Sequence, residues 1–159
     1  MGTAVTMKLY QTALGTLLTL GVVAAPALAE SSVPRFSAQA LIGLNLFLPY
    51  FGGEVSYRLP VLSDRIDVYA DYALNVTLCG CGGNQSYLVG ARYYFKPSGW
   101  WQPYATVRAG WMELGGTVPD AEVGIGADLM AFGHVGMDAA VFAGLPAVVR
   151  PQLGLKIAL

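Results

Sequence analysis

Charged side chains are scarce in this 159-residue chain, because Asp, Glu, Lys and Arg together make up 12% of the residues. The usual share in soluble globular domains is roughly 25%. Hydrophobic residues make up 55%. So little charge cannot cover a water-facing surface in the ordinary way, and the composition points toward lipid. A formal net charge of -1 without any Lys/Arg cluster excludes the basic field that nucleic-acid binding needs.

Long hydrophobic runs are also few. The N-terminal segment has an apolar stretch from Leu14 to Ala25, preceded by Lys8 and followed by Ala27-Leu28-Ala29, the small-x-small pattern that signal peptidase cuts. This segment predicts a secretory signal peptide at residues 1–29. The alternative is a membrane anchor helix, which the shortness of the run disfavours.

After the signal peptide, no stretch is apolar for the ~20 uninterrupted residues that a spanning helix needs. We expect a short lead-in at 30–35 and a single domain at 36–159. If the mature chain lies in a membrane, it therefore crosses as strands. At the N-terminus, Met7 followed by a lysine resembles a natural start more closely than Met1 does.

Apolar and polar residues alternate along this domain with a period of two, which is typical of β-strands. In "PYATVRAGW" (103–111), for example, Val107 belongs to the apolar row and Arg108 to the other. The pattern predicts eight strands, at 36–47, 53–59, 65–76, 86–95, 101–112, 120–130, 134–142 and 150–159. Turn residues such as Pro49, Gly52-Gly53 and Gly144 separate them, and such short connections predict antiparallel neighbours.

The mid-strand charges predict which face meets lipid. All fall opposite the aliphatic row of their strand: Glu54, Arg58, Asp67, Asp71, Arg92, Arg108, Glu122, Asp128, Asp138 and Lys156. An eight-stranded barrel has an interior just wide enough for side chains, and closure removes the unpaired sheet edges that are costly in hydrocarbon. The sequence therefore predicts an all-β fold, an eight-stranded antiparallel up-and-down transmembrane β-barrel with an ion-paired lumen.

An even strand number places both ends of such a barrel on one side, which the signal peptide predicts to be the periplasm. Aromatic residues gather near both predicted rims. Those near the periplasmic turns are Tyr57, Tyr93, Phe95, Trp100, Trp101 and Phe132, and those near the opposite rim are Phe47, Tyr50, Phe51, Tyr87 and Trp111. Two such belts are typical of barrels anchored at both membrane interfaces.

Catalytic residue types are poorly placed. His134 is the single histidine, on which any Ser/His/acid hydrolase would depend, and strand order places it near a periplasmic turn with Ser86 near the opposite rim. Asp67 and Asp71 lie about 13 Å apart on a strand at ~3.3 Å per residue, whereas paired-carboxylate glycoside chemistry needs about 5–9.5 Å. The sequence predicts no enzyme and no cofactor.

The two cysteines, Cys79 and Cys81, lie at a predicted outer loop tip. In the oxidising compartment that a signal peptide implies, this arrangement predicts a disulfide that closes the loop, with free thiols as the alternative. Two thiolates are too few for a four-ligand metal site, so none is predicted.

The stretches "YLVGARYYF" (87–95) and "WQPYATVRAGW" (101–111), with the alternating final strand, resemble the small eight-stranded bacterial outer-membrane barrels of the OmpA transmembrane-domain, OmpX and opacity-protein kind. The resemblance implies a monomer in the bacterial outer membrane that contacts outer-membrane lipid and is inserted by the barrel-assembly machinery. The chain departs from this family in ending at Leu159 rather than at an aromatic residue, and in its short outer loops.

Together these observations predict a structural or cell-envelope interaction protein with a packed lumen. Fold specifies function weakly, and two alternatives stay open. One is a narrow channel for small solutes or ions, and the other is a soluble, lipocalin-like ligand-binding barrel.

Overall fold

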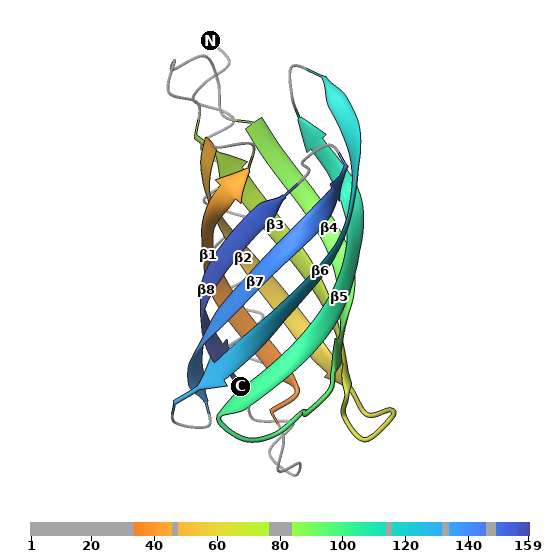
Figure 1. The fold of residues 1–159 in the computed structure, drawn as a ribbon, viewed down its shortest axis with the longest axis vertical. Helices are drawn as coiled ribbons and strands as arrows, with labels where there is room; N and C mark the ends of the chain where they lie inside the picture. Colours follow the sequence, from red (N-terminus) through yellow and green to blue (C-terminus); the bar gives the residue numbers. More distant parts are fainter. Residues whose placement is uncertain (1–33, 46–47, 77–83, 114–115, 132–133, 146–148) are drawn as a thin grey trace.

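The computed structural model describes residues 34–45, 48–76, 84–113, 116–131, 134–145 and 149–159, which form a closed barrel (Figure 1). Its strands are β1 (Phe36–Asn45), β2 (Leu48–Leu59), β3 (Ile66–Asn75), β4 (Asn84–Tyr94), β5 (Trp101–Glu113), β6 (Thr117–Met130), β7 (Val135–Leu145) and β8 (Arg150–Ala158). Each strand pairs antiparallel with the next, and β1 pairs with β8 to close the ring. The predicted all-β, eight-stranded up-and-down barrel is confirmed.

The barrel has two distinct ends. The lower end in Figure 1 carries Phe36, Leu159, the turns at 60–65 and 95–100, and the end of β6, and the Leu159 amide donates to the Phe36 carbonyl there, at 2.7 Å. β1, β3, β5 and β7 run toward the upper end and finish there. Both ends of the barrel domain therefore lie on the same side, as an even number of strands requires.

The second strand begins earlier than the sequence predicted. We expected it at 53–59, after a turn at Pro49 and Gly52-Gly53, but β2 starts at Leu48 and pairs with β1 up to Asn45. Gly52 is not a turn residue: a Cβ atom there would lie 2.4 Å from the Tyr72 carbonyl oxygen of β3, so glycine permits close approach of the two strands. Gly144, also expected in a turn, likewise lies within β7.

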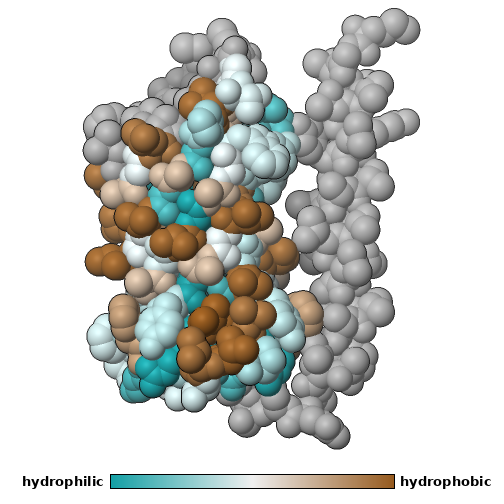
Figure 2. All heavy atoms as spheres, turned by 90° about the vertical axis from the view of Figure 1, so that its right-hand side faces the viewer, coloured by the Kyte–Doolittle hydropathy of each residue, from teal (hydrophilic) through white to brown (hydrophobic). Residues whose placement is uncertain are grey.

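Side chains alternate between the lumen and the outer wall along every strand. In β8, for example, Gln152 and Lys156 are buried, whereas Leu153 and Leu155 are exposed. Figure 2 shows hydrophobic side chains in patches over the barrel face that is turned to the viewer. The interior is polar and the exterior aliphatic, the reverse of a water-soluble protein.

One residue of the predicted aromatic belts lies inside the barrel. Tyr50 is buried in the lumen, where its hydroxyl donates to Gln152 Oε1 at 2.9 Å. The belt prediction followed the position of Tyr50 near the rim and overlooked its parity, which it shares with Gly52 and Glu54. Phe47 and Phe132 fall outside the described residues.

Candidate functional site

The lumen collects twelve buried charged side chains, and these form the candidate site. All ten residues predicted to face the lumen are buried: Glu54, Arg58, Asp67, Asp71, Arg92, Arg108, Glu122, Asp128, Asp138 and Lys156. Asp120 and Arg150 are buried with them. Seven of these residues are acidic and five are basic, so the described lumen carries an excess of two acids.

Arg92 of β4 lies at the centre of the first cluster. Its guanidinium donates to both carboxylate oxygens of Glu54 on β2, with 2.6 Å between Nη1 and Oε1. The same guanidinium lies over the rings of Tyr69 and Tyr104, 4.2 and 5.1 Å from their centroids. A bidentate ion pair packed between two aromatic rings leaves little space for water at this level of the lumen.

Arg108 of β5 holds the second cluster, nearer the upper end. Its Nε donates to Glu122 Oε2 at 2.6 Å, and its Nη1 donates to Asp71 Oδ2 at 3.0 Å and to Gln152 Oε1 at 3.2 Å. The guanidinium lies 3.4 Å from the ring centroid of Phe142. This one side chain therefore connects strands from opposite sides of the barrel.

Glu122 is shared between two arginines. Arg150 Nη1 lies 3.5 Å from Glu122 Oε1 and 3.5 Å from Asp120 Oδ2, and its guanidinium lies 5.0 Å from the Tyr50 ring centroid. The second cluster thus continues to the upper end of the lumen.

A third cluster lies toward the lower end. Lys156 Nζ donates to Asp128 Oδ2 at 2.6 Å and to the Tyr94 hydroxyl at 3.2 Å, and that hydroxyl donates to the same carboxylate at 2.8 Å. Arg58 Nε donates to Asp67 Oδ1 at 2.7 Å. The structure thus gives Asp67 and Asp71 separate cationic partners and does not bring them together as a catalytic pair.

Asp138 differs from the other buried acids of the described lumen, because it forms no salt bridge there. It lies directly opposite Asp128 in the β6–β7 register, and its Oδ1 accepts from the Tyr104 hydroxyl at 2.5 Å. Its Oδ2 is buried and has no hydrogen-bond partner among the described residues, and the same holds for both carboxylate oxygens of Asp120. Asp71, Glu122 and Asp128 each have one such oxygen as well, and Asp120 is paired with Arg150, so Asp138 is distinguished by the lack of an ion pair in the described lumen.

Asp120 and Arg150 were missed by the sequence analysis. Both lie near strand ends, where boundaries are uncertain by a few residues, so they were not counted as mid-strand charges. Their parity was informative, since Asp120 is in step with Glu122 and Arg150 is in step with Gln152 and Lys156.

The remaining predicted sites lie apart. His134 is exposed at the lower end, with its Nδ1 3.3 Å from the Ala158 carbonyl oxygen, and Ser86 is buried within β4 in the upper part of the barrel. Cys79, Cys81 and the proposed signal peptide at 1–29 lie outside the described residues. Within the described ranges, no group of His, Cys, Asp or Glu side chains has the size and geometry to hold a metal ion. In the same ranges, no helix is long and apolar enough to cross a membrane.

Comparison with known proteins supports the fold. No protein-family model matches the chain, and no curated protein matches it. Among solved structures, the N-terminal β-barrel domain of Pseudomonas aeruginosa OprF is similar, with a TM-score of 0.65 at 14% identity over 80% of this chain and 98% of that one.

Two further solved structures share the arrangement. A protein from the de novo design of transmembrane β-barrels has a TM-score of 0.64 at 14% identity, covering 82% of this chain and 99% of that one. The Yersinia pestis outer membrane protein Ail in a phospholipid bilayer nanodisc has a TM-score of 0.55 at 14% identity, over 79% of this chain and 99% of that one. At these identities the likeness establishes a shared fold.

Proposed function

We propose that this chain is a bacterial outer-membrane β-barrel protein with a plugged lumen and a structural or cell-envelope interaction role, without enzymatic activity. The observation that carries the proposal is the distribution of charge and aliphatic surface. Twelve charged side chains are buried inside, whereas the outer wall exposes residues such as Ile125, Val123 and Leu155 at 70%, 61% and 64%. A wall of this kind is stable in hydrocarbon and prone to aggregation in water.

Exposed aromatic residues support the membrane placement. Tyr93, Phe95, Trp100 and Trp101 are exposed at the lower end, and Phe51 and Trp111 toward the upper end. Aromatic rings favour the boundary between hydrocarbon and headgroups, so two belts are expected where a barrel crosses both interfaces. Monomeric insertion by the barrel-assembly machinery, and removal of residues 1–29 on the way, belong to the same proposal. Mass spectrometry of the envelope-bound protein tests the removal.

The plugged lumen follows from the ion pairs. A continuous ion path would have to separate Arg92 from Glu54 and Arg108 from Asp71 and Glu122, all buried. Removing one partner from a buried ion pair costs about 3–5 kcal/mol of stability. The closed arrangement is therefore strongly favoured over an open one.

A narrow cation channel is the second candidate function. It is favoured by the two excess acids and by the carboxylate oxygens of Asp120 and Asp138 that lack hydrogen bonds in the described lumen. Such groups attract cations, and rings of acids select for them in known channels.

Conductance in planar bilayers separates these two functions. The plugged barrel is expected to show at most small, rare openings. Replacing both Arg92 and Arg108 with Ala leaves Glu54 and Asp71 without their cations and Glu122 with Arg150 alone. Water and cations are therefore expected to enter, and both conductance and cation preference should rise. Arg65→Ala, at a half-buried arginine of the lower rim outside the lumen, is the control and should leave the current unchanged. Steady, porin-like currents from the unaltered protein would replace the plugged barrel with the channel.

The lipocalin-like alternative is tested by solubility. The aliphatic wall predicts that the mature protein stays with the outer-membrane fraction and needs detergent for extraction. Recovery as a monodisperse protein in detergent-free buffer would contradict membrane insertion.

A further inference from the structure

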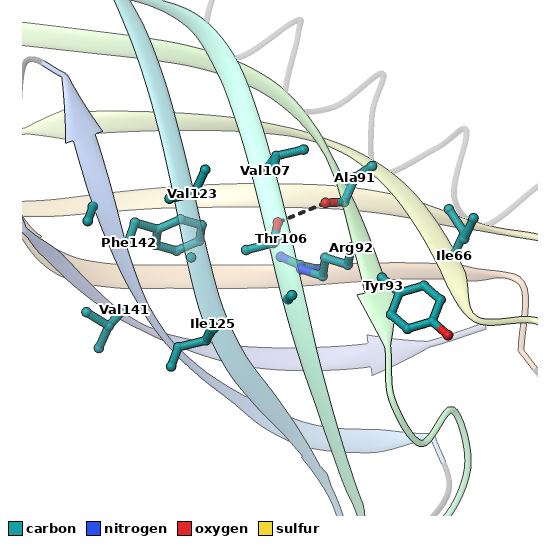
Figure 3. Close-up of a pocket in the computed structure, with 13 residues that line it drawn as sticks. Ile66, Ala91, Arg92, Tyr93, Thr106, Val107, Val123, Ile125, Val141 and Phe142 are labelled. Carbon is teal, nitrogen blue, oxygen red and sulfur yellow. Dashed lines mark hydrogen bonds between the residues drawn. The ribbon is translucent and has the colours of Figure 1, made fainter.

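A shallow apolar groove crosses the outer wall of the barrel. It has a volume of about 690 Å³ and is bordered by Tyr93, Val107, Val123, Ile125 and Val141 (Figure 3). Ala91 also lines it, and Ala105 lies between Tyr93 and Ile125 in the strand register. Figure 3 shows these side chains spread across neighbouring strands, with Ile66 and Tyr93 at one side and Val141 at the other. The small alanines leave the hollow that the bulkier neighbours enclose.

The groove rises from the lower rim to the middle of the wall. Strand register connects its residues in one row: Ile66, Tyr93, Ala105, Ile125 and Val141. Ile66 is the first residue of β3, at the lower end, whereas Val141 is the seventh residue of β7 and lies well inside the wall. Four steps between strands, about 4.8 Å each, give a length of ~19 Å. One leaflet of hydrocarbon is about 15 Å deep, so a tilted groove of this length spans about one leaflet.

Arg65 lies at the low end of the groove, and Lys96 lies in the adjacent turn. Arg65 precedes Ile66, and its Nη1 lies 3.3 Å from the Phe95 carbonyl oxygen and 3.4 Å from the Tyr93 hydroxyl. Lys96 follows Phe95 and is exposed. Within the described chain neither cation has a carboxylate partner, whereas the third cation of this rim, Arg35, is paired with Asp64 at 3.1 Å.

The contacts of Arg65 leave donors for a ligand. The described hydrogen bonds use only Nη1, and a guanidinium carries further N–H groups on Nη2 and Nε. Arginine at a membrane interface binds phosphate through parallel N–H donors. The Tyr93 hydroxyl and the edge-to-face contact of Tyr93 with Phe95, at 5.7 Å between centroids, place this cation beside an aromatic pair at headgroup level.

We propose that this groove binds one anionic phospholipid of the leaflet at the lower end. One acyl chain lies in the groove over Ala105, between Tyr93 and Val141, and the phosphate group is held by Arg65 and Lys96. Charge favours this occupant, because Arg65 and Lys96 have no carboxylate partner in the described chain and lie at the end of the groove that reaches the rim. The inference goes beyond the proposed function, which requires contact with lipid but no preferred lipid.

Native mass spectrometry of the folded protein with two lipids of identical acyl chains tests the proposal. In detergent micelles supplemented equally with phosphatidylglycerol and phosphatidylcholine, we expect one retained lipid per barrel and about a tenfold preference for phosphatidylglycerol. Arg65→Gln together with Lys96→Gln should remove the preference, while Arg65→Lys alone should keep most of it because the charge remains.

Filling the groove separates specific binding from general lipid contact. Ala105→Leu should reduce retention of both lipids by about tenfold, since the side chain occupies the path of the acyl chain. Ala109→Leu, an exposed alanine on the same strand outside the groove, is the matched control and should change nothing. All four variants lie outside the lumen, and circular dichroism verifies that each barrel is folded.

Several outcomes would overturn the proposal. Equal retention of both lipids by the unaltered protein, or equal effects of Ala105→Leu and Ala109→Leu, would mean that the groove holds ordinary surrounding lipid. A lipid-free dimer would mean that a second copy covers the groove. None of these results would contradict membrane insertion or the plugged lumen. Those two proposals fail only if the protein is soluble without detergent or conducts porin-like currents.

Discussion

At the scale of single residues, identical side chains have opposite roles because their partners differ. Asp128 and Asp138 face each other across β6 and β7, yet Asp128 binds Lys156 and Asp138 binds only the neutral Tyr104 hydroxyl among the described residues. Burial without a counter-charge is costly for a carboxylate. The charge of Asp128 therefore stabilises the folded barrel, whereas the charge of Asp138 destabilises it.

Asparagine substitutions at these two positions should have different effects. Asp128→Asn leaves the buried Lys156 ammonium without its charge partner and is expected to lower the free energy of unfolding by about 3–5 kcal/mol. Asp138→Asn keeps an acceptor for Tyr104 and removes a repulsive charge, so stability should stay the same or rise. Urea unfolding in lipid vesicles measures both, and a loss of equal size at the two positions would contradict this description of the lumen.

Two consecutive glycines offer a second residue-scale test. A Cβ atom at Gly52 would lie 2.4 Å from the Tyr72 carbonyl oxygen, whereas at Gly53 the nearest heavy atom, the Gln39 carbonyl oxygen, is 3.7 Å away. Gly52→Ala should therefore force β2 and β3 apart and cost about 1–3 kcal/mol. Gly53→Ala should stabilise the strand by about 0.5–1 kcal/mol, because alanine loses less backbone entropy on folding. Unfolding of both variants in the same vesicles checks the difference, and equal effects would place the strand contact elsewhere.

At the scale of strands, the alternation of side chains determines which residues each element presents on the outer wall. Val107 is the central residue of β5 and Val135 the first residue of β7, and both point outward, with 56% and 49% of their surface exposed. They differ in depth, since one lies at mid-wall and the other at the lower rim.

Arginine at these two valines should reveal the depth of the wall in the bilayer. Val107→Arg is expected to cost about 2–4 kcal/mol in bilayer folding, and Val135→Arg about 0–1 kcal/mol, because a charge near the interface reaches water and headgroups. Folding equilibria in phosphatidylcholine vesicles provide the measurement. If the two substitutions cost the same free energy, the outer wall does not cross the hydrocarbon layer as proposed.

The strands and their faces followed from the sequence because a two-residue period is a local property. Lys156 and Leu155 differ in parity, and this difference alone places Lys156 in the lumen and Leu155 on the outer wall. The partners of the charges were not predictable, because Arg108 meets Asp71 and Gln152 only after the barrel closes, and closure depends on register around the whole ring. The start of β2 was predicted wrongly because glycine marks both turns and places where neighbouring strands come close.

At the scale of the whole molecule, accessible positive charge lies at one end. Of the eight Lys and Arg residues in the described ranges, Arg58, Arg92, Arg108, Arg150 and Lys156 are buried in the lumen, and Arg35, Arg65 and Lys96 lie at the lower rim. In this part of the chain the upper end has no exposed cation. Within the described ranges, accessible positive charge therefore lies at the lower end of the barrel.

Amine labelling should read out this asymmetry. Lys96 is exposed and Lys156 is 3% exposed, so a membrane-impermeant amine reagent should modify Lys96 alone of these two. In intact cells we expect no modification, and permeabilising the outer membrane should make Lys96 reactive, as peptide mass spectrometry would record. Lys96→Arg serves as the control. Reaction of Lys96 in intact cells would reverse the orientation, and reaction of Lys156 would mean that water fills the lumen.

The pairing of β1 with β8 also determines when the barrel can close during folding. Ser37 pairs with Ala158 and Gly43 with Gln152, so β1 completes its pairing only when β8 is present. Tyr50 likewise finds its acceptor on Gln152, 102 positions along the chain. Closure therefore needs the whole of β8, and until β8 pairs with β1 both strands keep unpaired backbone edges. Such edges can pair with other chains, so the stage before closure is the one at which a chaperone can protect this protein.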